Sequence, residues 1–222
     1  MTRDSTPLLA ARGAGRRFGD QTALHPTTLE IWDGEVVDLL GPNGAGKSTL
    51  LALLAGGLEP TWGHVECRER VRVGWTPQRP AHYGRLSPRE NLELFAELEG
   101  EPDPEAAAAR LLQRFELPDT PRPSARLSVG NRQRLNLAIS MLGSPDVLLL
   151  DEPTASLDPP QRRRLWQSAV DVKEHGGAVV FATQNHEELE GHADRVAVLV
   201  EGSLVFDGPL DEYEHTAARM LA

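Results

Sequence analysis

Short apolar runs alternate along this chain with segments that have helical periodicity. The runs at residues 36–40, 147–150 and 178–183 are dominated by Val, Leu, Ala and Phe. Such runs are typical of strands that are buried on both faces, as in a parallel sheet covered by helices. The alternation therefore predicts an α/β fold with a mainly parallel sheet.

The first third and the end of the chain add further strands. Runs near residues 8–11, 27–31 and 65–73 predict strands around a glycine-rich segment. Residues 196–200 and 203–207 resemble a closing hairpin that turns at Glu201 and Gly202. We therefore expect an antiparallel β region beside the parallel sheet.

The middle of the chain carries helix signals. Ser87-Pro88-Arg89-Glu90 is a capping box with proline at the first helical position, so a helix should run from there to residue 100. A second helix should open at residues 103–104, and three prolines at 118–123 should form an extended linker ahead of a helix at 132–142. We expect a single domain over residues 1–222, with a core at 1–78 and 144–222 and a helical subdomain at about 79–143.

Composition limits the classes of function. The chain has 222 residues and a formal net charge of −10, which argues against general nucleic-acid binding because that function usually needs a basic face. The lone cysteine, Cys67, excludes an intramolecular disulfide, and we expect it to be buried or half-buried. No apolar run reaches the roughly 18 residues of a membrane span, and the N-terminus lacks the apolar core of a signal peptide. We expect a soluble, cytoplasmic protein that reaches a membrane only through a partner.

Residues 41–48, with the sequence GPNGAGKS, form a complete phosphate-binding loop between an apolar strand and a helix-like run. Its glycines let the backbone curl so that successive N–H groups point at a phosphate, at the positive end of the next helix. Lys47 should reach the β- and γ-phosphates, and the Ser48 hydroxyl should bind Mg²⁺. The chain otherwise has only Lys173 as a lysine, which favours a specific use of Lys47 over a chance glycine-rich turn. The expected nucleotide-binding residues here are Gly41, Pro42, Asn43, Gly44, Ala45, Gly46, Lys47, Ser48 and Thr49.

Asp151 and Glu152 follow the buried strand at 147–150. Ligands of open α/β sheets bind outside the carboxyl ends of the strands, which is where this pair should lie. We expect Asp151 to hold the Mg²⁺ shell and Glu152 to polarise the attacking water. The alternative is an acidic cap for a helix that begins at Pro153.

The order of these segments resembles the ATP-binding cassette (ABC) family. Residues 41–48 match its Walker A motif, residues 148–152 match its Walker B motif, and LSVGN at 127–131 falls where its signature motif lies. Motifs in the right order run from residue 18 to about residue 186. The resemblance implies a P-loop NTPase core of the ABC ATPase type, with ATP and Mg²⁺ as its cofactors.

The resemblance also assigns three single residues. Phe18 is similar to the aromatic residue that stacks on adenine, although a core aromatic at a strand end is an alternative. Gln78 resembles the Q-loop glutamine that contacts Mg²⁺ or the lytic water, with a solvated loop residue as the alternative. Asp158, in Ser156-Leu157-Asp158, resembles the D-loop aspartate, but its place before Pro159 also makes it a helix N-cap.

The signature implies a site shared between two chains. Ser128 and the Gly130 N–H stand at a helix start, which favours an anion, and in the family this helix end binds the γ-phosphate held by the opposite subunit. Val129 replaces the usual first glycine and Asn131 the usual glutamine. An ordinary serine-capped helix is the alternative.

One departure from the family follows the strand at 178–183. Alignment on the following acidic pair puts Gln184 at the position of the usual histidine, with His186 two residues late. Gln184 can donate a hydrogen bond to a phosphate oxygen but carries no charge, and His186 also fits the exposed start of the next helix. The resemblance therefore implies ATP hydrolysis through Glu152, Gln78 and Gln184.

The resemblance implies an ATPase subunit that dimerises around ATP with a second ABC ATPase domain, here another copy of itself. It would drive export through separate transmembrane permease subunits, at the cytoplasmic face of the membrane. A hydrolysis-impaired partner in a heterodimer and a soluble ABC ATPase are the alternatives. A nucleotide or sugar kinase would not explain residues 127–131 or the Gln184 region.

Overall fold

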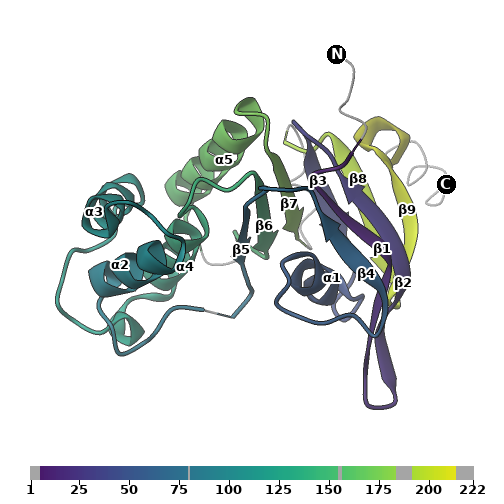
Figure 1. The fold of residues 1–222 in the computed structure, drawn as a ribbon, viewed down its shortest axis with the longest axis horizontal. Helices are drawn as coiled ribbons and strands as arrows, with labels where there is room; N and C mark the ends of the chain where they lie inside the picture. The colour runs from purple at the N-terminus through teal and green to yellow at the C-terminus, as the bar shows by residue number, and fades with distance from the viewer. Residues whose placement is uncertain (1–5, 80, 155–156, 184–191, 214–222) are drawn as a thin grey trace.

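The protein is described by a computed structural model that covers residues 6–79, 81–154, 157–183 and 192–213 (Figure 1). Its strands are β1 (Leu9–Phe18), β2 (Gln21–Ile31), β3 (Val36–Leu40), β4 (Trp62–Cys67), β5 (Val73–Thr76), β6 (Val147–Asp151), β7 (Ala178–Ala182), β8 (Arg195–Val200) and β9 (Ser203–Pro209). Its helices are α1 (Lys47–Leu54), α2 (Pro88–Leu98), α3 (Pro104–Arg114), α4 (Val129–Ser140) and α5 (Pro159–Glu174), with a short 3₁₀ helix at Ser124–Arg126.

The larger sheet has six strands in the order β5-β6-β7-β3-β8-β9. Every neighbouring pair is parallel except β8 and β9, which form an antiparallel hairpin. All five residues of β3, β6 and β7 are buried, because helices or the second sheet cover both faces. The predicted mainly parallel α/β sheet is confirmed.

The smaller sheet is antiparallel, with the order β2-β1-β4. The strand predicted at 65–73 is wrong in its extent. The chain turns after Cys67, where the Val71 N–H donates to the Arg68 carbonyl at 3.1 Å, and Arg70 has a φ of 66°. Residues on either side of this turn join different sheets, as β4 and β5. Cys67 lies on the edge strand β4 and is exposed, so the expectation that it is buried or half-buried is wrong.

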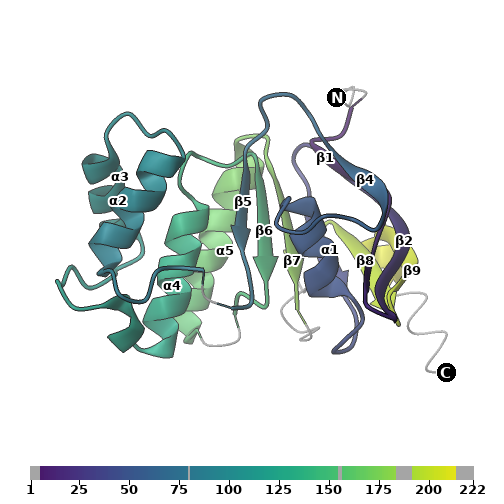
Figure 2. The same cartoon turned by 60° about the horizontal axis from the view of Figure 1, so that its bottom comes forward.

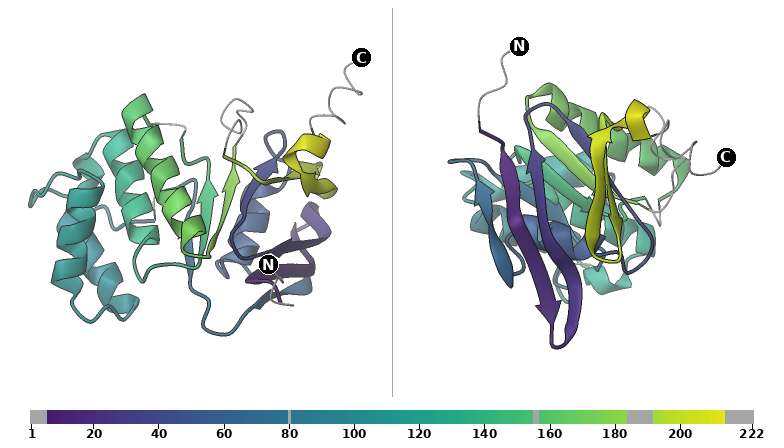
Figure 3. Two further views of the ribbon diagram at one scale, coloured as in Figure 1. Left: turned by 90° about the horizontal axis from the view of Figure 1, so that it is seen from above. Right: turned by 90° about the vertical axis from the view of Figure 1, so that its right-hand side faces the viewer.

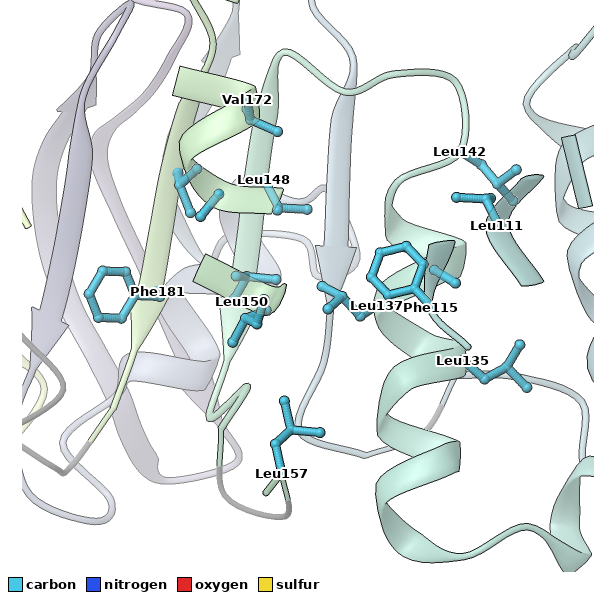
Figure 4. Packing of buried hydrophobic residues seen from close by; sticks show 14 of the residues in the cluster. Leu111, Phe115, Leu135, Leu137, Leu142, Leu148, Leu150, Leu157, Val172 and Phe181 are labelled. Atoms are coloured by element: carbon cyan, nitrogen blue, oxygen red, sulfur yellow. The ribbon is translucent and has the colours of Figure 1, made fainter. Parts of the chain in front are cut away.

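Two hydrophobic clusters fill the opposite faces of the larger sheet. One contains Val147 and Leu149 of β6 together with α1 and the smaller sheet, so α1 lies between the two sheets (Figure 2). The alternate residues, Leu148 and Leu150, belong to the other cluster with α4 and α5. Figure 4 shows this second cluster extending from Phe181 on β7 past β6 to α4.

Helices α2, α3 and α4 lie side by side at one end of the molecule, away from the smaller sheet (Figures 1 and 3). The capping box of α2 forms as predicted, with the Glu90 N–H donating to the Ser87 hydroxyl. Helix α4 begins at Val129 rather than at residue 132, because the Ser128 hydroxyl accepts the Asn131 N–H and caps the helix there. None of the helices in the described ranges is both long and apolar enough to cross a bilayer.

Candidate nucleotide-binding site

A cavity of about 520 Å³ opens at the phosphate-binding loop. Residues from the loop, from the carboxyl ends of the strands and from the smaller sheet line it. They are Phe18, Gln21, Thr22, Ala23, Asn43, Gly44, Ala45, Gly46, Lys47, Ser48, Thr49, Gln78, Asp151, Glu152, Glu201 and Gly202. The fold thus brings together residues that the sequence analysis assigned to four separate motifs.

The loop itself requires glycine at specific points. Gly41 has a φ of 150°, and a Cβ there would lie 2.2 Å from the Leu199 carbonyl oxygen of β8. Gly46 has a φ of 100°, and its Cβ would lie 2.7 Å from the Ala23 carbonyl oxygen. Gly46 also occupies the N-cap of α1, and no side chain from the described ranges caps that helix. The N–H groups of its first turn therefore remain as donors toward the cavity.

Lys47 is the first residue of α1, and its side chain is held inside the loop. Its ammonium group donates to the carbonyl oxygens of Gly41 at 2.6 Å and Pro42 at 3.2 Å. Only 6% of the residue is exposed. An ammonium group has three donors, so this arrangement leaves one N–H for a phosphate in the cavity.

Asp151 ends β6 and is 3% exposed. Burial raises the pKa of its carboxyl, while hydrogen bonds from the Ser48 hydroxyl and the Gln78 N–H act in the opposite direction. The positive charge of Lys47 also lowers this pKa. Within the described part of the chain, the Oδ1 atom of Asp151 is buried without a hydrogen-bond partner. A buried carboxylate oxygen beside a hydroxyl is a donor set suited to Mg²⁺.

Glu152 follows at the cavity wall with an unusual backbone. Its φ is 50°, in the left-handed region that non-glycine residues rarely adopt, and its N–H donates to the Ala182 carbonyl at 2.9 Å. That bond connects the residue to β7, next to β6 in the sheet. Strained backbone of this kind is concentrated at functional sites.

The structure places Phe18 and Gln78 at the cavity wall and excludes one alternative for Phe18. Phe18 ends β1 with 49% of its surface exposed and lines the cavity, so the core-aromatic interpretation is wrong. Gln78 follows β5, is exposed, and also lines the cavity. Its backbone N–H bonds to Asp151, so this exposed loop residue lies beside the expected Mg²⁺ ligand, and both interpretations of Gln78 stay open.

The signature residues lie elsewhere. The Ser128 hydroxyl accepts the Asn131 N–H at 3.2 Å, and neither of these residues nor Gly130 lines the cavity. The side-chain amide oxygen (Oδ1) of Asn131 accepts a hydrogen bond from the Arg134 guanidinium. Val129, which lies between Ser128 and Gly130, is 58% exposed. The start of α4, where the sequence predicts anion binding, is therefore not part of the cavity of its own chain.

Asp158 caps α5 in a full capping box and accepts the Gln161 N–H at 2.9 Å. It does not line the cavity either. Gln184 and His186 lie outside the described residues.

Sequence reasoning missed the part of the wall formed by Gln21, Thr22, Ala23, Glu201 and Gly202. The predicted hairpin included Glu201 and Gly202, but nothing in the pattern connected its turn to the phosphate loop. The structure makes the connection through hydrogen bonds from the Gly202 N–H to the Ala45 carbonyl at 3.1 Å and from the His25 N–H to the Gly202 carbonyl at 2.8 Å. Long-range backbone contacts of this kind leave no local sequence signal.

Comparisons with known proteins agree with this geometry. The sequence profile of the family described as ABC transporter matches residues 24–155. The daunorubicin resistance ATP-binding protein DrrA3 of Streptomyces coeruleorubidus is 41% identical over 213 residues, which cover 90% of this chain and 67% of that protein. The Nod factor export ATP-binding protein I of Ralstonia nicotianae is 34% identical over 224 residues, which cover 92% of this chain and 68% of that protein.

Other relatives are much longer. ATP-binding cassette sub-family A member 7 of Mus musculus is 38% identical over 187 residues, which cover 78% of this chain but only 9% of that protein. A solved ATP-binding subunit of an ABC transporter superposes with a TM-score of 0.85 at 27% identity, covering 95% of this chain and 93% of that one. With its P-loop core, this chain belongs to the ABC transporter family and is one of its ATP-binding ATPase domains.

Proposed function

We propose that this chain binds ATP with Mg²⁺, pairs with a second ABC ATPase domain around the nucleotide, and hydrolyses ATP to drive export through separate membrane-spanning subunits. The observation that carries the proposal is the cavity, where the phosphate loop meets Gln78, Asp151 and Glu152. Each of these groups comes from a different segment, and each suits one part of Mg²⁺-dependent phosphoryl transfer.

The phosphates would be held by fixed partial charges. The open N–H groups at the start of α1 and the Lys47 ammonium group would bind the β- and γ-phosphates. This local positive field explains how a chain with a net charge of −10 can bind a polyanion.

Three residues would hold the metal: Ser48, Gln78 and Asp151. Among the described residues nothing bonds the Oδ1 of Asp151, and this oxygen and the Ser48 hydroxyl beside the carboxylate fit a hard cation with oxygen ligands. When bound, Mg²⁺ neutralises charge on the β- and γ-phosphate oxygens.

Hydrolysis would begin at Glu152. Its carboxylate would polarise a water whose oxygen attacks the γ-phosphorus, with the proton passing to Glu152. The bond between the γ-phosphorus and the bridging oxygen then breaks, which releases ADP and inorganic phosphate. Gln78 would orient the water, and Gln184 would contact the γ-phosphate as the resemblance implies.

The site would be completed by a second domain. Ser128, Gly130 and Asn131 lie at the start of α4, outside the cavity of their own chain, and a helix start in that place suits a γ-phosphate bound by the opposite subunit. Asp158 would lie at the same interface. We take the second domain to be another copy of this chain.

Transport and its direction are inferred from relatives. DrrA3 is named for daunorubicin resistance and the Ralstonia protein for Nod factor export, and both are more than 30% identical to this chain. The membrane subunits would bind at the loop around residues 78–86 and at the helical subdomain, residues about 79–143, which joins the core at 1–78 and 144–222. The chain would then lie at the cytoplasmic face of the membrane, held there by its partners.

The test is the substitution Glu152→Gln. With ATP and Mg²⁺, this variant should form a stable dimer in size-exclusion chromatography and lose turnover, because the site closes but the water is not activated. Glu105→Gln, at an exposed position of α3, is the matched control and should behave as the wild type. Unchanged ATPase activity in Glu152→Gln would refute the role of Glu152. Absence of turnover in the wild type, together with ATP-dependent association with a different cassette only, would favour the hydrolysis-impaired alternative.

A further inference from the structure

The ring of Phe18 has a cation against it. The guanidinium carbon of Arg16 lies 4.9 Å from the centroid of this ring, within the range of a cation–π contact. Both residues belong to the last part of β1, at the rim of the cavity. Arg16 itself does not line the cavity.

Arg16 is held from its other side. Its Nη1 atom donates to the carbonyl oxygen of Glu59 at 2.7 Å, and the residue is half-buried. Glu59 lies in the loop between α1 and β4. This loop forms two more hydrogen bonds with β1: the Thr61 N–H donates to the Gly15 carbonyl at 2.7 Å, and the Arg17 N–H donates to the Thr61 hydroxyl at 3.1 Å. The guanidinium is therefore fixed between an anchored loop and the aromatic ring.

This arrangement links the two ends of the nucleotide site. Helix α1 begins at the phosphate loop, and the segment that follows it carries Glu59. Arg16 joins that segment to Phe18. With one side of the ring against Arg16 and 49% of the residue still exposed, the remaining ring surface is free to form the cavity wall.

We propose that Arg16 is a positioning residue for the nucleobase, holding Phe18 in the orientation that stacks on the adenine of ATP. The inference rests on the proposed function, in which Phe18 contacts the base. Because Arg16 does not line the cavity, its effect should act through Phe18 and should not extend to the phosphates. A fixed ring also avoids the entropy that a free aromatic side chain would lose on stacking.

The experiment compares a ligand that has a base with one that has none. Dissociation constants of ATP and of inorganic tripolyphosphate are measured by calorimetry for the wild type, Arg16→Met, Arg16→Lys and Phe18→Ala. Arg16→Met should weaken ATP binding about 3- to 10-fold, the size of an exposed to partly desolvated cation–π contact, and leave tripolyphosphate binding unchanged. Arg16→Lys keeps the cation and should recover part of the loss.

Two controls isolate the pair. In the Phe18→Ala background, Arg16→Met should cause no further loss, because the ring that it positions is gone. Arg17→Met is the matched neighbour, since the guanidinium of Arg17 lies 6.0 Å from the Trp62 ring instead. It should bind both ligands as the wild type does.

The outcomes separate this inference from the proposed function. If Phe18→Ala leaves the preference for ATP over tripolyphosphate unchanged, base stacking on Phe18 is refuted and the role of Arg16 falls with it. If Phe18→Ala weakens ATP binding but Arg16→Met does not, only the role of Arg16 is refuted. Equal weakening of both ligands in Arg16→Met and Arg16→Lys would show that Arg16 supports the fold or the phosphate site, which also overturns the inference.

Discussion

The phosphate loop offers a sharp test, because two of its glycines differ in what a Cβ would meet. Gly41 and Gly44 both have positive φ, at 150° and 79°. A Cβ on Gly41 would lie 2.2 Å from the Leu199 carbonyl oxygen, whereas a Cβ on Gly44 would meet nothing within 4 Å. Replacing each glycine by alanine therefore separates backbone strain from a collision with β8.

The expected magnitudes differ accordingly. Gly44→Ala should cost about 1–2 kcal/mol of the free energy of unfolding, the strain of a left-handed non-glycine residue. Gly41→Ala should cost about 2–6 kcal/mol, because a strained backbone adds about 1–3 kcal/mol and a displaced neighbour another 1–3 kcal/mol. The collision is with backbone of β8, which pairs with β3, so no flexible side chain can move aside.

Urea unfolding of the two variants and the wild type is followed by circular dichroism. The loss of unfolding free energy in each variant is calculated from the shift of the urea midpoint, with the same slope m for all three proteins. Since the Lys47 ammonium group donates to the Gly41 carbonyl at 2.6 Å, ATP binding should also weaken more in Gly41→Ala than in Gly44→Ala. Equal destabilisation of the two variants would refute the argument that packing under β8 shapes this loop.

Three further predictions concern caps, charge geometry and pH. Ser87→Ala removes the α2 capping box and should lower the free energy of unfolding by about 1 kcal/mol in urea, with Ser87→Gly losing less. Lys47→Arg keeps the charge but puts a planar guanidinium where the loop holds an ammonium group, so the ATP dissociation constant measured by calorimetry should rise at least about tenfold. An unchanged dissociation constant would contradict this. His192 stacks on Trp166 at 4.5 Å, and burial lowers its pKa, so the folded state disfavours its charged form. The stabilisation of the wild type relative to His192→Gln should therefore be complete above the ordinary histidine pKa of about 6.5, and it should decrease as the pH falls from there toward the lowered pKa. A difference in urea midpoints between the two proteins that stays constant from about pH 7.5 to 5.5 would count against it.

Much of the fold could be predicted because its signals are local. The run at 147–150 predicted a strand buried on both faces, and β6 indeed divides its residues between two hydrophobic clusters. The capping box at Ser87 and the cap at Asp158 formed as predicted, since a cap needs only residues within one turn. The helix predicted at 132–142 begins three residues earlier in the structure, because the Ser128 hydroxyl caps a turn that already includes Val129, Gly130 and Asn131.

The sequence by itself determined the chemistry of the site: a glycine-rich loop with Lys47 and Ser48, a strand ending in Asp151 and Glu152, and their order along the chain. These features depend only on the backbone conformation and the hydrogen-bonding groups of residues close together in the sequence. Only the tertiary structure decided that Phe18 is exposed at the cavity with Arg16 against it, and that the turn at Gly202 supports the loop. Those contacts depend on which strands become neighbours and on how two sheets pack around α1, and long-range packing of that kind is set by the whole core rather than by any local pattern.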